Sequence, residues 1–171
     1  NPSIELATTG YTAKSGTIAR SAVEQYHGTY SLAVTPIAGD TTDGAYYAIG
    51  LTAGTVYALS CKFLGVLGGS YKIGVFTTAD AQLAAHRFIA TGRWQWVTVI
   101  YAENSSATRR FYFNKDGTAS TNVFYVDGVQ IEVITDGVLQ ATTYIDGDQL
   151  GLLPGQQPPA YGWNGTPHAS T

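Results

Sequence analysis

Side chains that could carry catalysis are present in this sequence, but they are not grouped as a catalytic site requires. The three histidines, His27, His86 and His168, are scattered and lack the spacing of a metal site. Most aspartates stand in turn-forming sequences, whereas a glycosidase needs two carboxylates placed around the scissile bond. Ser60 lacks the glycine-flanked turn that exposes a hydrolase nucleophile. The sequence therefore predicts no enzymatic activity.

The single cysteine, Cys61, can form no disulfide within the chain and no thiolate metal site. It alternates with Tyr57, Leu59 and Phe63, so we expect a small buried side chain. A nucleophilic thiolate would need a neighbouring base, and the local sequence offers none.

Short segments that alternate apolar and polar residues cover most of the chain up to residue 133. A period of two residues is typical of β-strands with one face in a core, and many such segments separated by Gly, Asp and Asn clusters indicate a sandwich or barrel. The helix-favouring segment 78–85 is too short for an independent helix, and we expect a turn or a broken strand there. The expected strands are Tyr30–Pro36, Tyr46–Thr52, Tyr57–Phe63, Tyr71–Thr77, Trp94–Tyr101, Arg109–Asn114 and Phe124–Val133.

The same alternation predicts which side chains point away from the core. Trp96 should lie on the face opposite Val97 and Val99, whereas Trp94 is expected in the core. If the strands share a sheet, aromatic and basic side chains form a patch on the solvent face. The expected members of this patch are Lys72, Phe76, Trp96, Arg110, Tyr112 and Tyr46. An exposed patch of this kind usually marks an interaction, and one interpretation is a packing face for the C-terminal segment or for another protein.

Composition narrows the classes of partner. Charged residues make up 12% of the chain, the net charge is −3, and Arg109-Arg110 is the only adjacent basic pair, so a nucleic-acid partner is not expected. No apolar stretch approaches the roughly 20 residues of a membrane-spanning helix. We see no signal peptide, and the chain contains no Met, so we expect a processed product or a piece of a longer protein.

The alternating pattern ends near residue 135. The remaining residues are rich in Gly and Pro, a composition that favours an extended or polyproline-like segment. We therefore expect one β-sandwich domain over residues 1–135, followed by a C-terminal arm over residues 136–171. The arm is expected to dock on the sandwich, or on a neighbouring protein, through Tyr161 and Trp163.

Four segments carry motifs that stand in the order of a known fold. They are Asn1–Glu5 (N-x-S-I-E), His27–Val34 (G-x-Y-S-L-x-V), Leu51–Ser60 (L-x-x-G-x-x-Y-x-L-S), and Trp94 with Phe124–Glu132 (W-x-x-V-x-V and Y-x-D-x-V-x-I-E). In this order they resemble the carbohydrate-binding modules of families 4, 9 and 22, and together they cover about residues 1–133. The resemblance implies an all-β, two-sheet antiparallel jelly-roll β-sandwich. It also implies that the aromatic and basic patch is a carbohydrate-binding site, with a sugar ring stacked on its aromatic rings. The carbohydrate-binding residues would be Lys72, Phe76, Trp96, Arg110, Tyr112 and Tyr46.

The resemblance also implies a structural calcium ion (Ca²⁺). In these modules a Glu of the opening strand and an Asp of the closing strand bind calcium together with main-chain carbonyls. On this sequence the ligands are Glu5, Asp127 and carbonyls near Gly28 and Tyr30. Calcium takes six to eight oxygen ligands at about 2.3–2.6 Å, and here it would pin the N-terminal segment to the sheet. The alternative is that Glu5 is an ordinary surface residue and Asp127 caps a bulge beside Gly128.

Residues 142–149 and 163–170 resemble the C-terminal segment of bacteriophage and prophage tail proteins. The leading hypothesis is therefore a non-catalytic virion module of a tail, baseplate or fibre that adheres to host surface polysaccharide, where multiple copies strengthen a weak contact. The arm would contact other virion proteins, and a homo-oligomer is compatible with a fibre. The alternatives are a decoration or cement domain of a capsid or tail without sugar binding, and a binding module of a secreted carbohydrate-active enzyme.

Overall fold

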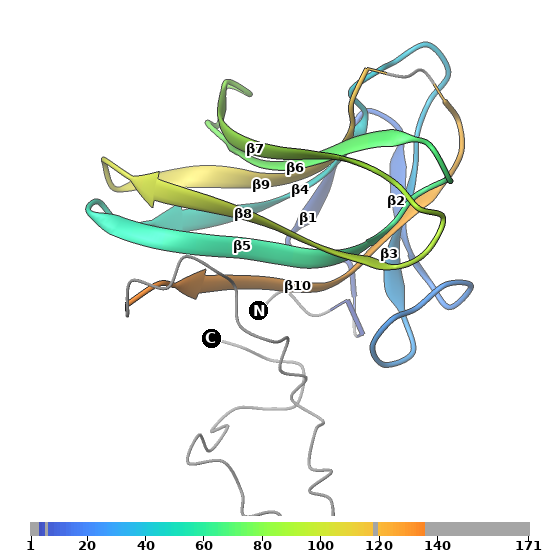
Figure 1. The fold of residues 1–171 in the computed structure, drawn as a ribbon, viewed down its shortest axis with the longest axis horizontal. Coiled ribbons are helices and arrows are strands. Elements are labelled where there is room, and N and C mark those ends of the chain that lie inside the picture. The colour runs from blue at the N-terminus through green and yellow to red at the C-terminus, as the bar shows by residue number, and fades with distance from the viewer. Residues whose placement is uncertain (1–3, 6, 118–119, 136–171) are drawn as a thin grey trace, which may run out of the picture.

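Ten β-strands make up two stacked antiparallel sheets in the computed structural model, which describes residues 4–5, 7–117 and 120–135 (Figure 1). No helix occurs in these described residues. The strands are β1 (Tyr11–Lys14), β2 (Thr17–Ser21), β3 (Ser31–Thr35), β4 (Gly44–Leu51), β5 (Thr55–Leu64), β6 (Ser70–Phe76), β7 (Gln82–Ile89), β8 (Gln95–Glu103), β9 (Ala107–Lys115) and β10 (Phe124–Val133).

Strands that follow each other in sequence mostly lie in different sheets. Sheet A has the order β1-β4-β9-β6-β7, and sheet B has the order β2-β3-β10-β5-β8. In sheet A, β6 and β7 are the one pair of strands that are consecutive in the sequence of described strands. In sheet B, the one such pair is β2 and β3. This repeated crossing between layers is the predicted jelly-roll sandwich, and it brings residues far apart in sequence onto one face.

The core lies between the two sheets and is rich in aromatic rings. Phe63 of sheet B stacks on Phe124 of the neighbouring strand, with ring centroids 5.1 Å apart. Across the core it meets Phe88 at 5.0 Å and Tyr71 at 4.9 Å. Cys61 is fully buried beside this cluster, and burial raises the pKa of its thiol well above the usual value. The expectation of a small buried side chain at Cys61 is confirmed.

All seven predicted strands are present, each with ends within two residues of the prediction. Three further strands, β1, β2 and β7, were not predicted. Segment 78–85 contains both the predicted turn and the start of β7. The edge strand β7 shows no clear alternation because most of its residues are exposed or half-buried. Glu5, which was expected in an opening strand, lies in a turn.

The predicted C-terminal arm, residues 136–171, lies outside the described residues, as do Tyr161 and Trp163. Within the part of the chain that the structure describes, no helix is long and apolar enough to cross a membrane.

Candidate functional site

The side chains of sheet A that point away from the core include a group of aromatic and charged residues. Cross-strand pairing places Tyr46 of β4 beside Tyr112 of β9, and Arg110 beside Phe76 of β6. The Tyr46 and Tyr112 ring centroids are 5.0 Å apart, and the Arg110 guanidinium lies 4.6 Å from the Tyr46 ring centroid. We call this group, together with Asp80, the Tyr46 surface.

Two of its members are buried although they point away from the core. Tyr112 is 1% exposed and Phe76 is 6% exposed, because they cover each other edge to face at 4.7 Å and neighbouring side chains cover both. The Phe76 ring also leans over Gly74, where a Cβ atom would stand 3.0 Å from it. Their predicted direction is confirmed, but their predicted exposure is wrong. A ligand can reach the half-buried Tyr46 ring, Arg110 and Asp80.

Asp80 completes the Tyr46 surface, and the sequence analysis did not single it out. It lies in the 77–81 turn with a φ of 64°, a left-handed conformation that non-glycine residues seldom adopt. Its Oδ1 atom accepts hydrogen bonds from the Tyr112 hydroxyl and from Arg110 Nη1, both at 2.5 Å. The hydrogen bond from Tyr112, aided by Arg110, holds the pKa of Asp80 below its usual value. Burial and the bond to Asp80 raise the pKa of Tyr112.

Lys72 lies on the same face of sheet A but apart from the Tyr46 surface. Its ammonium pairs with Asp116 at 3.1 Å, and Asp116 also pairs with Arg87 at 2.8 Å. Lys72 is only 9% exposed, so its predicted exposure to solvent is wrong as well. With its charge already paired, Lys72 is poorly placed to meet a ligand.

Trp96 lies on the other sheet, so its predicted place in one patch with Tyr46 is wrong. Strand β8 pairs with β5 in sheet B, and Trp96 stands opposite Lys62 there. It does point away from the core, as predicted, because Val97 and Val99 are buried. Trp94, expected in the core, is half-buried and meets the Tyr26 ring edge to face at 6.0 Å.

The Glu5 carboxylate, one of the two predicted calcium ligands, accepts hydrogen bonds from main-chain amides. Thr29 N–H donates to both of its oxygens at 3.0 Å, and Tyr30 N–H donates to Oε1 at 3.0 Å. Gly28 permits this close approach, because a Cβ atom there would stand 2.4 Å from Glu5 Oε1. Gly28 also has a φ of 69°, which favours glycine.

The Asp127 carboxylate is held in the same manner. Its Oδ2 atom accepts from the amides of Tyr26 at 2.8 Å and His27 at 2.9 Å, and its Oδ1 atom accepts from Gly128 N–H at 2.6 Å. The β10–β5 register shifts just after Asp127, so Asp127 caps a bulge beside Gly128, as the alternative interpretation expected. Burial raises the pKa of this carboxyl, and the amide donors act in the opposite direction.

These contacts do not fit a calcium cage. Calcium needs oxygen ligands on all sides, whereas N–H donors face both carboxylates. Among the described residues, no three Asp, Glu, His or Cys side chains are grouped as metal ligands. The two carboxylates instead fasten the loop of residues 22–30 to the N-terminal segment and to β10. The family resemblance predicts that calcium binds here, whereas these contacts predict that the fold does not require it.

We expect the thermal unfolding midpoint to differ by less than about 2 °C between EDTA and excess CaCl₂. The amides already satisfy Glu5 and Asp127, so the fold does not need a cation there. Circular dichroism melts provide the measurement. A midpoint that rises with calcium concentration in the wild type, but not in Glu5→Gln, would show that calcium displaces the amides.

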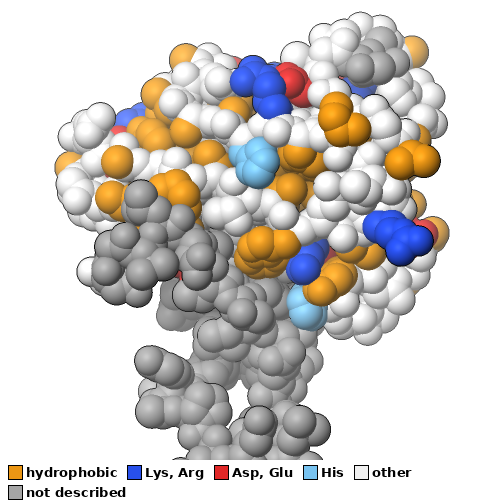
Figure 2. Space-filling model, in the orientation of Figure 1, with side chains coloured by type: hydrophobic (Ala, Val, Ile, Leu, Met, Phe, Trp, Pro, Cys, Tyr) orange, Lys and Arg blue, Asp and Glu red, His pale blue; other side chains and the backbone are white. Residues whose placement is uncertain are grey.

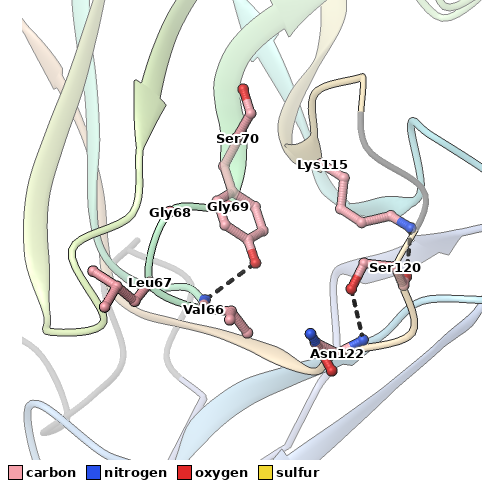
Figure 3. A pocket seen from close by; sticks show the side chains of 9 residues that line it. Val66, Leu67, Gly68, Gly69, Ser70, Lys115, Ser120 and Asn122 are labelled. Carbon is pink, nitrogen blue, oxygen red and sulfur yellow. Dashed lines mark hydrogen bonds between the residues drawn. The ribbon is translucent and has the colours of Figure 1, made fainter.

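A cavity of about 210 Å³ lies between the β5–β6 turn and the segment after β9 (Figure 3). Its polar groups bond one another. Val66 N–H donates to the Tyr71 hydroxyl at 3.2 Å, Lys115 Nζ donates to the Ser120 carbonyl at 2.6 Å, and Asn122 N–H donates to Ser120 Oγ at 3.1 Å. The first bond lies within the β5–β6 turn region and the other two lie within the segment that follows β9, so each wall of the cavity is fixed by its own hydrogen bonds.

Comparison with known proteins supports the fold. No protein-family model matches the sequence, and no curated protein matches it. Among solved structures, a family 16 carbohydrate-binding module has a TM-score of 0.61 at 19% identity, over 77% of this chain and 96% of that one. The CBM22-1 xylan-binding domain of Paenibacillus barcinonensis Xyn10C has a TM-score of 0.58 at 20% identity, over 82% and 93%.

A third similar structure is an arabinose-bound α-L-arabinofuranosidase, MgGH51, with a TM-score of 0.64 at 14% identity. The match covers 77% of this chain but 25% of the arabinofuranosidase, so this chain corresponds to one part of that protein. At these identities the similarity establishes the fold. The predicted jelly-roll β-sandwich of the carbohydrate-binding-module type is confirmed.

Proposed function

We propose that this chain is a non-catalytic polysaccharide-binding domain and that the Tyr46 surface is its sugar site. One observation carries the proposal. An aromatic ring, a guanidinium and a carboxylate stand together on the outer face of a sheet, fixed by buried neighbours. The Asp80 and Arg110 side chains are 44% and 23% exposed, so both reach solvent.

The chemistry of these groups suits a pyranose ring. The apolar face of the sugar packs on the Tyr46 ring, which buries C–H groups against an aromatic surface. Arg110 donates hydrogen bonds to sugar oxygens, and the Asp80 carboxylate accepts them from sugar hydroxyls. Because Tyr112 and Arg110 already fix Asp80, little side-chain freedom is lost when the ligand binds.

The same geometry argues against hydrolysis. A glycosidase needs a carboxylic acid that is protonated before it acts on the leaving group. The pKa of Asp80 is lowered, so this carboxyl is ionised at neutral pH. Two of the similar structures are named for binding modules alone, and one of these is named for xylan binding.

The first test is native gel electrophoresis through soluble xylan, with wild type, Tyr46→Ala and Arg110→Ala compared. Each substitution is expected to weaken binding about tenfold or more, which corresponds to about 1.4 kcal/mol. Tyr46→Ala removes the stacking ring, and Arg110→Ala removes a charged donor. A panel of other soluble polysaccharides run in the same way identifies the sugar if xylan is not the ligand.

Arg20→Ala is the matched control. The Arg20 guanidinium lies 4.0 Å from the Tyr30 ring centroid, so this variant also removes an arginine stacked on a tyrosine, but away from the Tyr46 surface. It should bind as the wild type does. Loss of binding in Arg20→Ala to the same extent, or no retardation of the wild type by any polysaccharide, would contradict the proposal. Melting curves confirm that each variant is folded.

The biological setting of this binding domain is also part of the proposal. We predict a virion location because residues 142–149 and 163–170 resemble phage tail proteins, and these residues lie outside the described structure. The module of a carbohydrate-active enzyme is the alternative, since one similar structure contains a CBM22-1 module joined to a xylanase module. Sequence encoded on either side of this chain separates the two settings. Contacts with other virion proteins and assembly into a homo-oligomer are expected only in the virion setting.

A further inference from the structure

A second group of aromatic side chains surrounds a lysine on the outer face of sheet B. Lys62 Nζ lies 4.1 Å from the Tyr26 ring centroid and 5.2 Å from the Trp96 ring centroid. Trp94 meets the Tyr26 ring edge to face, with ring centroids 6.0 Å apart. We call Tyr26, Lys62, Trp94 and Trp96 the Trp96 surface. Figure 2 shows hydrophobic, basic and histidine side chains near one another on the side where β5 and β8 lie in Figure 1.

The loop of residues 22–30 builds this surface, and the structure fixes that loop firmly. The Asp127 carboxylate binds the amides of Tyr26 and His27, and the Ser31 hydroxyl donates to the Glu24 carbonyl. The main chain at Tyr26 is therefore fixed, although the residue is 44% exposed. An exposed ring in a fixed position loses little freedom when it binds a ligand.

The charge of Lys62 is the feature that selects the ligand. No carboxylate among the described residues forms an ion pair with Lys62. Asp127 stands opposite Lys62 in the neighbouring strand, but its oxygens are turned to three main-chain amides. Contacts between an ammonium and aromatic rings are weak at an exposed site, so the contacts with Tyr26 and Trp96 leave the Lys62 ammonium able to bind an anion.

We propose that the Trp96 surface is a second carbohydrate site, selective for polysaccharides that carry carboxylates, such as those with uronic acids. A uronic acid carboxylate pairs with Lys62, while the sugar ring packs on the faces of Tyr26 and Trp96. This site lies on the opposite sheet from the Tyr46 surface and does not depend on it. The inference extends the proposed function to a second ligand class.

Polygalacturonate is the probe, and unsubstituted xylan is the neutral comparison. Binding is measured by affinity electrophoresis in the Tyr46→Ala background, which removes the first site. Polygalacturonate is expected to retard this variant, and adding Lys62→Gln or Trp96→Ala should weaken that binding about tenfold. Sodium chloride should weaken it as well, because exposed charges are screened within about 10 Å at 0.1 M salt.

Arg87→Gln is the matched control, since it removes one positive charge from an exposed side chain on sheet A. Its binding to polygalacturonate should be unchanged. No binding of polygalacturonate, or equal binding by Lys62→Gln, Trp96→Ala and Arg87→Gln, would overturn the inference. This test is independent of the one for the Tyr46 surface. If the Tyr46 surface is not a sugar site, xylan binding will be the same in the wild type and in Tyr46→Ala, whatever the result with polygalacturonate.

Discussion

Replacing Lys115 with alanine is expected to destabilise the protein by about 3–5 kcal/mol, because it leaves a buried carboxylate without its counter-charge. The Lys115 side chain is 3% exposed, and its Nζ lies 3.6 Å from Oδ2 of the fully buried Asp43. The ammonium also donates to the carbonyls of Asp40 at 2.8 Å and Ser120 at 2.6 Å (Figure 3). It therefore joins three segments around the end of β9.

The surroundings of Asp43 explain why the Lys115→Ala substitution should cost so much stability. The Oδ2 atom of Asp43 accepts a hydrogen bond from Ile37 N–H at 2.5 Å. Its Oδ1 atom is buried and has no hydrogen-bond partner among the described residues. Without Lys115, the carboxylate keeps its charge in a medium that solvates charge poorly, or it takes up a proton, and either change costs free energy.

Urea unfolding at pH 7 measures this effect. Arg87→Ala is the control, because the Arg87 side chain is 56% exposed and its pair with Asp116 should contribute only about 0–1 kcal/mol. The double variant Asp43→Asn/Lys115→Met removes both charges and is expected to recover much of the lost stability. A Lys115→Ala variant no less stable than Arg87→Ala would show that the pair is solvated in the folded protein.

Replacing Phe63 with alanine is expected to cost a similar amount, about 3–5 kcal/mol, for a different reason. Phe63 is fully buried and contacts rings from both sheets, namely Phe124 in sheet B and Tyr71 and Phe88 in sheet A. Alanine removes most of the buried ring and leaves a cavity that the stacked sheets can fill only in part. The loss of buried apolar area and the cavity both lower the free energy of unfolding.

The measurement is again urea unfolding, and Leu83→Ala is the control. Leu83 is 42% exposed on edge strand β7, so its truncation should change stability by roughly 0.5 kcal/mol or less. Because Phe63 points into the core, the Phe63→Ala variant should still bind ligand below its unfolding transition. A cost below about 1 kcal/mol would contradict close packing of the aromatic rings at this position.

The local sequence pattern predicts most of the strands and the direction of their side chains. A strand turns successive side chains to opposite faces, so the alternation around Val97 and Val99 predicts both a strand and its inward face. The same rule places Tyr46, Arg110 and Tyr112 on the outer side of their strands. It fails for β7, an edge strand whose side chains are little buried and need not alternate.

The candidate sites depended on information that alternation does not contain. Alternation predicts which side chains of a strand face the core, but not which sheet the strand joins. Trp96 lies in sheet B because β8 pairs with β5. Asp80 stands in a turn, where no periodicity exists, and only the fold brings its carboxylate to Tyr112. Burial on an outer face, as at Tyr112, likewise depends on neighbours that are distant in sequence.

The sequence by itself determined the fold class, most strands and the direction of their side chains, because these follow from the two-residue period of a strand. The tertiary structure alone decided which strands are neighbours. That choice divided one predicted patch into two surfaces. The tertiary structure also brought the loop amides of His27 and Thr29 to the carboxylates of Asp127 and Glu5. The physical reason is that strand pairing in a jelly roll is set by contacts between residues far apart in the chain, which a local pattern cannot specify.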